Sequence, residues 1–227
     1  MEDLPAFIKI VFALTTFLTI ILFYTASRRS VNCIVILIIW SGLQAFVGWS
    51  EFYTVTDTIP PRFLLLIAPP LLFILILFVI HTGKQFIDHL DQRYLTLLHV
   101  VRIPVELVLF WLFVHKTIPE LMTFEGRNFD ILSGITAPIV YYFGFIKKTL
   151  SRTVLIIWNV ICLCLLFNVV INAILSVPTP FQKFAFDQPN IGVLYFPFNW
   201  LPACIVPLVL LAHLAALRQL LFNKSEP

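Results

Sequence analysis

Seven apolar runs, each close to the length of a membrane-spanning helix, follow one another along the 227-residue chain. They lie at about 6–26, 31–50, 63–81, 95–116, 131–147, 153–176 and 197–218. An α-helix needs about 20 apolar residues to cross the ~30 Å of hydrocarbon in a bilayer. Charged residues make up only 12% of the chain and hydrophobic residues 60%, which excludes an ordinary water-soluble domain. We therefore expect an all-α integral membrane protein, a bundle of seven transmembrane helices in which residues 1–227 form one domain.

The predicted loops differ in basic residues from one side of the bundle to the other. One side carries nine, namely Arg28, Arg29, Lys84, Arg93, Lys147, Lys148, Arg152, Arg218 and Lys224. The other side carries four, namely Arg62, Lys116, Arg127 and Lys183. Because cytoplasmic loops are enriched in Lys and Arg, this asymmetry predicts an outside N-terminus and a cytoplasmic C-terminus. The predicted location is the cell (inner, cytoplasmic) membrane, crossed several times.

Two ionisable residues lie in the fourth apolar run. Arg102 and Glu106 are four residues apart, so we expect their side chains to meet on one face of the helix. Pro104 lies between them and lacks a backbone N–H, which favours a local kink. A charge at the bilayer centre costs roughly 2.5–3.5 kcal/mol on insertion scales, and intramembrane charges often mark a substrate or ion pathway. The alternative is an ion pair that only fixes helix packing.

Further polar side chains fall inside other apolar runs. His99 shares the face of the charged pair, one turn nearer the start of its run. Asn168 and Asn172 are spaced by four in the run 153–176, while Gln44 and Tyr141 lie in the runs 31–50 and 131–147. Together with the charged pair, these residues are our candidates for a solute pathway or its coupling element. The alternative is that they make hydrogen bonds between helices, as asparagine in a bilayer commonly does.

The predicted loop between the fourth and fifth runs is dense in charge of both signs. Glu125, Arg127 and Asp130 lie within six residues of one another on the side predicted to be outside. We interpret them as an outer rim of the pathway. Loop charges that are simply solvated are the alternative.

Histidines gather toward the predicted cytoplasmic ends of the helices. His99 and His213 are about equally deep in two different runs, and His81 lies near the same side. Imidazole is a common metal ligand, and two histidines from facing helices can hold a haem between them. A haem or metal on His99, His213 and His81 is therefore one hypothesis, although the chain contains no HxxxH or HExxH spacing. The cofactor is otherwise unknown, and proton relay and structural histidines are the alternatives.

These features favour a transporter or channel for a small solute or ion, in which the charged pair is the coupling or gating element. The chain carries no Gly-rich phosphate loop and no Gly-x-Ser-x-Gly motif, which leans against an enzyme. The alternatives are a non-catalytic sensor or complex subunit, and a haem- or metal-dependent intramembrane enzyme. Expected partners are the lipid bilayer, the solute or ion, and a second copy or a membrane partner subunit. A net charge of +3 gives no indication of nucleic-acid binding.

Overall fold

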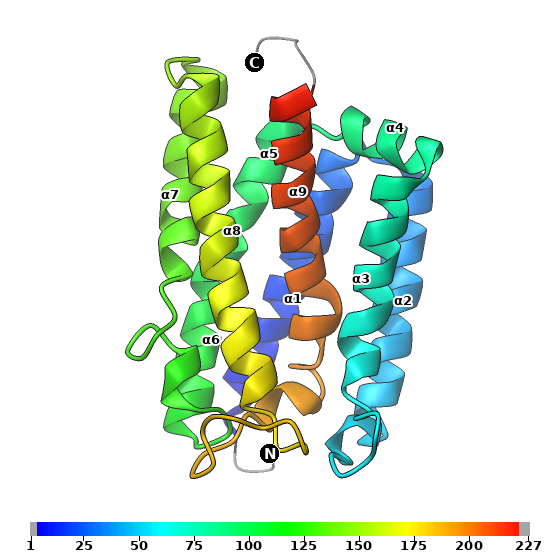
Figure 1. The fold of residues 1–227 in the computed structure, drawn as a ribbon, viewed down its shortest axis with the longest axis vertical. Helices are drawn as coiled ribbons and strands as arrows, with labels where there is room; N and C mark the ends of the chain where they lie inside the picture. The colour runs from blue at the N-terminus through cyan, green and yellow to red at the C-terminus, as the bar shows by residue number, and fades with distance from the viewer. Residues whose placement is uncertain (1–3, 223–227) are drawn as a thin grey trace.

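The structure, a computed structural model, describes residues 4–222, and all regular elements in that range are helical (Figure 1). The α-helices are α1 (Ala6–Ala26), α2 (Val31–Trp49), α3 (Leu64–Val79), α4 (His81–His89), α5 (Gln92–Leu98), α6 (Arg102–Val114), α7 (Ile131–Tyr141), α8 (Arg152–Leu175) and α9 (Val206–Phe222). The π-helices are η4 (Tyr142–Ile146) and η6 (Leu201–Ile205). The 3-10 turns are η1 (Phe52–Thr54), η2 (His99–Val101), η3 (Glu120–Met122) and η5 (Gly192–Leu194).

Five helical stretches are long and apolar enough to cross a bilayer, and a sixth is added if the bent pair α3–α4 counts as one. The five are Ala6–Ala26, Val31–Trp49, Gln92–Val114, Arg152–Leu175 and Leu201–Phe222. This is the pattern of a multi-pass helical membrane protein, as the sequence predicts. The predicted number of seven crossings and their orientation stay predictions.

The predicted span 63–81 ends earlier than expected. Helix α3 stops at Val79, and α4 leaves it at an angle of 95° after one extended residue, Ile80. Gly83 permits this bend, because a Cβ there would lie 2.4 Å from the carbonyl oxygen of Leu77. The polar residues of α4 thereby leave the apolar layer, and α4 lies across the end of the bundle (Figure 1). Residues His81–His89 thereby form a separate short helix between the third and fourth runs.

The predicted span 95–116 is formed by α5, η2 and α6 rather than by one regular helix. Pro104 explains the 3-10 turn, because it has no N–H to donate to the carbonyl of Val100 in an α-helical bond. The N–H of Arg102 instead bonds back to the turn at His99 and Val100. The irregularity falls near the middle of the Gln92–Val114 stretch, immediately before Arg102.

Residues 115–130 are predicted as a loop outside the bundle, but only part of the segment is exposed. They run back along α6, and α7 begins only about halfway up the bundle (Figure 1). Ile118, Thr123 and Asn128 in this segment are fully buried. The backbone bonds within itself, with the N–H groups of Gly126 and Asn128 both directed to the carbonyl of Thr123. Non-helical backbone at membrane depth is tolerated where it is buried in protein, as it is here.

Helix α9 lies at the centre of the bundle, and α3, α4, α5 and α8 pack around it. Most of its side chains are buried, including Ala212, Ala215 and Ala216. These small residues permit the neighbouring helices to approach closely. His213 is buried among them, and it faces the break between α5 and α6. The fold therefore brings polar residues from four elements to one place inside an apolar bundle.

Candidate functional site

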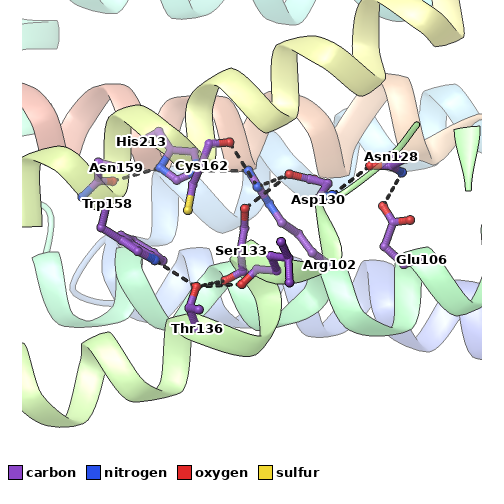
Figure 2. Close-up of polar contacts among 11 residues, drawn as sticks. Arg102, Glu106, Asn128, Asp130, Ser133, Thr136, Trp158, Asn159, Cys162 and His213 are labelled. Carbon is purple, nitrogen blue, oxygen red and sulfur yellow. Dashed lines mark hydrogen bonds and ion pairs between the residues drawn. The ribbon is translucent and has the colours of Figure 1, made fainter. Parts of the chain in front are cut away.

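A hydrogen-bonded chain of buried polar groups connects α6, the segment before α7, α8 and α9 (Figure 2). Its centre is Arg102, whose exposed fraction is 3%. Nη1 of Arg102 forms an ion pair with the carboxylate of Asp130. Nη2 lies 3.0 Å from Nε2 of His213. A charge in a low-dielectric interior needs such partners, and Arg102 has one of opposite charge.

The predicted pairing of Arg102 with Glu106 is wrong. Among the described residues, the ion-pair partner of Arg102 is Asp130. Side chains on a helix tilt toward its N-terminus, so an arginine that precedes a glutamate by four residues points away from it. Arg102 therefore reaches back past η2 to α9 and across to the start of α7. Asp130 also does not lie on the predicted outer rim, because only 5% of its surface is exposed.

Glu106 joins the chain through Asn128. Nδ2 of Asn128 donates to Oε1 of Glu106 at 2.7 Å and to the carbonyl of Met122 at 2.9 Å. Oδ1 of Asn128 accepts the backbone N–H of Asp130 at 3.0 Å. The other carboxylate oxygen of Glu106, Oε2, is buried and has no hydrogen-bond partner among residues 4–222. One acceptor atom of this buried carboxylate is thus free to meet a donor.

At the other end of the chain, the contacts of His213 define its tautomer. The guanidinium of Arg102 can only donate, so Nε2 of His213 accepts. Nδ1 therefore carries the hydrogen and donates to Oδ1 of Asn159 at 2.9 Å. Nδ2 of Asn159 donates to the carbonyl of Leu155 within α8. The series of hydrogen-bonded side chains ends at this carbonyl oxygen of the backbone.

His99 and His213 do come together, as their predicted depths indicate, but not as ligands of one ion. Their rings are stacked with centroids 3.8 Å apart and an interplanar angle of 14°. Imidazole lone pairs lie in the ring plane, so two nearly parallel rings at this distance cannot direct them to one metal or haem iron. His81 lies on α4, where it contacts Gln85. Within the described range, no three His, Cys, Asp or Glu side chains are grouped to hold a metal ion.

An apolar pocket of about 150 Å³ borders the polar chain. Its walls come from α3, α6, α8, η6 and α9, and its polar lining consists of Arg102, Glu106, Asp130 and Asn190. Oδ1 of Asn190 is a second buried acceptor without a partner in the described chain. The pocket is therefore apolar over most of its surface, with two free acceptor oxygens.

The pocket extends to the outer surface of the bundle between α3 and α8. Leu71 of α3 and Phe167 of α8 line it, and both are exposed on the outside of the bundle. In a membrane this surface faces lipid. The site is therefore placed between the lipid-facing surface and the buried charges.

The other predicted pathway residues lie apart from this pocket. Asn168 donates to the carbonyl of Arg127 at 2.7 Å and accepts from Asn172. Gln44 accepts from the hydroxyl of Tyr53 at 2.6 Å, and so acts between α2 and η1. Tyr141, near the end of α7, is half-buried. Asn168 thus bonds α8 to the segment before α7, its contact with Asn172 lies within α8, and Gln44 bonds α2 to η1.

Of the three predicted outer-rim residues, Glu125 and Arg127 are exposed. Both belong to the segment that runs back along α6, so they lie beside the bundle on either side of Gly126. Gly126 cannot carry a side chain, because a Cβ would lie 2.3 Å from the carbonyl oxygen of Glu120. Glu125 and Arg127 therefore project from a tightly folded segment.

Three residues of the site were not among the predicted candidates: Asn128, Asn159 and Asn190. Asn128 and Asn190 fall in stretches that read as solvated loops, because nothing local in the sequence indicates that those loops fold into the bundle. Asn159 lies in an apolar run, and its position there is the one signal that points to a buried partner.

Comparison with known proteins places the chain in a family without assigning it an activity. Residues 59–221 match the family described as a domain of unknown function, DUF8737. The chain belongs to this family. The DUF8737 match begins before α3 and includes every residue of the polar chain and every residue that lines the pocket. No curated protein and no solved structure matches the chain.

Proposed function

We propose that this DUF8737 member is a transporter for a small solute, which binds in the pocket beside Glu106. The observation that carries this proposal is the free Oε2 of Glu106, a buried acceptor on the wall of an apolar pocket. Ionisable residues inside a membrane most often serve a substrate or ion pathway. The coupling element is then Glu106 with Asn128, and the Arg102–Asp130 pair holds the surrounding helices in place.

Irregular helices around the site support the same proposal. The break at η2 precedes Arg102, α7 begins at Ile131 beside it, and the π-helix η6 lines the pocket. Transporters commonly form midplane binding sites from discontinuous helices of this kind. π-helical segments likewise occur frequently at functional sites.

The pocket also limits what the solute can be. About 150 Å³ is the volume of a cavity that holds a molecule of benzene's size. Free acceptors on Glu106 and Asn190 favour a hydrogen-bond donor, such as an amine or a hydroxyl group. A proton and the donor group of the solute would compete for the same oxygen of Glu106. Solute binding would thereby be coupled to proton release.

We further propose seven crossings, with the N-terminus outside and the C-terminus in the cytoplasm. In this arrangement α3 is one crossing, and α7 with η4 completes another together with residues 117–130. The excess of basic residues at the end of the bundle that carries α4 supports this orientation. Lys224, which contributes to that count, lies outside the described residues.

The test begins with a thermal-melting screen of the purified protein against small amines, alcohols and carboxylates of up to about six carbons. We expect amines or alcohols to stabilise the native protein and Glu120→Gln, which alters an exposed carboxylate, but not Glu106→Gln. A stabilising compound is then followed into proteoliposomes, where uptake and proton release should both depend on Glu106. Equal stabilisation of Glu106→Gln, or stabilisation by carboxylates alone, would contradict the proposal.

A second candidate function is a non-catalytic sensor or complex subunit. The hydrogen-bonded polar chain favours this candidate, because it ends where Asn159 donates to the carbonyl of Leu155 and does not continue as a path through the bundle. A compound that stabilises the protein through Glu106 without being taken up would favour this candidate.

A further inference from the structure

A second, larger cavity of about 500 Å³ lies between α2 and α3, away from the polar chain. Its lining residues come mainly from α2 and α3 and from η6 and α9. Its lining is almost entirely apolar along its length, with Trp40, Phe73 and Leu208 among the large side chains. Polar residues, Ser30 and Asn32, occur only at the end near α4.

The cavity has the length of one lipid leaflet. Along α2 its lining runs from Ser30 to Trp40, ten residues that rise about 15 Å at 1.5 Å per residue. Half of the ~30 Å hydrocarbon layer is about 15 Å. Phe86 of α4 also lines it, and α4 lies at 95° to α3. An amphipathic helix in that position lies at the level of the headgroups. The cavity thus runs from the headgroup level to about the bilayer centre.

The headgroup end is basic. Arg28 and Arg29 are exposed in the turn immediately before Ser30, and Lys84 lies on α4 two residues before Phe86. No ion pair within residues 4–222 involves these three side chains. The nearby carboxylates form ion pairs with other residues: Asp88 pairs with Arg218 at 2.9 Å, and Asp91 pairs with Arg93 at 2.6 Å and interacts only more weakly with Arg28.

From this arrangement we infer that the cavity between α2 and α3 is a binding site for an anionic phospholipid. One acyl chain lies along Trp40 and Phe73, and the phosphate lies near Arg28, Arg29 and Lys84. The apolar length selects an acyl chain of one leaflet, and the basic cluster selects the negative headgroup. The site does not depend on the transport proposal, because it shares no polar residue with the pocket beside Glu106.

The test uses bromine quenching of tryptophan fluorescence in phosphatidylcholine proteoliposomes. A fixed fraction of the lipid is replaced either by brominated phosphatidylglycerol or by brominated phosphatidylcholine. Trp40 lines the cavity, whereas Trp158 contacts Thr136 elsewhere in the bundle. We expect quenching by brominated phosphatidylglycerol to show an apparent affinity at least about fivefold higher, the factor for one basic side chain near an anionic surface.

Four variants make the outcome decisive. The phosphatidylglycerol preference should be lost in Trp40→Phe and persist in Trp158→Phe. It should also be lost when Arg28, Arg29 and Lys84 are all changed to Gln. It should persist when Lys147 and Lys148 are changed to Gln, because these exposed residues lie beyond α7 at the same end of the bundle. Equal quenching by the two lipids, or a preference that survives in Trp40→Phe or in the triple variant, would overturn the inference.

Discussion

Arg102 and Asp130 are 28 residues apart in the sequence and form a buried ion pair between the start of α6 and the start of α7. The pair places the first residue of α7 at about mid-height in the bundle, beside the break in the preceding span. It also brings Asn128 within reach of Glu106. One ion pair therefore determines how the non-helical segment before α7 is held inside the bundle.

Removing one member of this pair should destabilise the protein strongly. Asp130→Asn or Arg102→Leu leaves an uncompensated or poorly paired buried group, which typically costs about 3–5 kcal/mol. The double variant should recover part of that loss, since no charge is then left unpaired. Thermal melting of the three variants in detergent measures the coupling. If the loss of stability in the double variant equals the sum of the two single losses, the predicted coupling of Arg102 and Asp130 is contradicted.

The exposed pair Asp91–Arg93 is the matched control for that experiment. Surface ion pairs contribute about 0–1 kcal/mol, so Arg93→Gln should have a much smaller effect. A large effect would show that the assay does not distinguish buried from exposed pairs.

Glu106→Gln and Glu106→Ala should separate folding from binding. The amide oxygen of glutamine can still accept from Asn128, so Glu106→Gln should melt within about 1 kcal/mol of the native protein. Glu106→Ala leaves the donor of Asn128 with only the carbonyl of Met122, and it should cost about 1–3 kcal/mol. Both variants should lose stabilisation by amines or alcohols. Retained stabilisation in either one would remove Glu106 from the binding site.

Helix α2 offers a matched pair of glycines. A Cβ at Gly48 would lie 2.5 Å from Nδ2 of Asn199, which donates to the carbonyl of Gln44. Gly48→Ala must therefore displace Asn199 and should cost about 1–3 kcal/mol. At Gly42 a Cβ would have nothing within 4 Å, so Gly42→Ala should stabilise the helix by up to about 1 kcal/mol. Melting shifts of the same sign for both variants would refute this interpretation.

Asp91 should contribute a pH-dependent part of the stability. A side-chain hydrogen bond from Arg93 lowers the pKa of Asp91 below its ordinary value of 3.8. A lowered folded-state pKa means that the contribution is complete above 3.8 and is lost as the pH falls through the lower value. Asp91→Asn keeps a capping side chain for α5 but loses the charge. The melting difference between native protein and Asp91→Asn should therefore be constant above pH 3.8 and shrink as the pH falls further, and a difference that does not shrink below pH 3.8 would contradict the prediction.

Helix periodicity and hydropathy predict the helical class and most helix positions, because each depends on residues close in sequence. That residues 117–130 fold back into the bundle could not be predicted in this way. Their charges are typical of a solvated loop, and only the contact with Arg102 explains why Asp130 is buried. The predicted partner of Arg102 was wrong for the same reason, because helical spacing indicates Glu106 and carries no information about Asp130. His99 and His213 were correctly expected at similar depth, yet their stacking depends on how α9 is rotated.

The proposed orientation can be tested with single cysteines at exposed positions. Lys116→Cys lies in the turn after α6, and Lys148→Cys lies between η4 and α8. If α7 with residues 117–130 completes a crossing, a membrane-impermeant maleimide should label Lys116→Cys from outside intact cells. Lys148→Cys should be labelled only after the membrane is permeabilised. The maleimide should not label the native cysteines, because Cys33, Cys162 and Cys204 are buried and Cys164 lies within the apolar helix α8. Labelling of both positions from the same side would show that α7 does not separate them, and the seven-crossing arrangement would have to be abandoned.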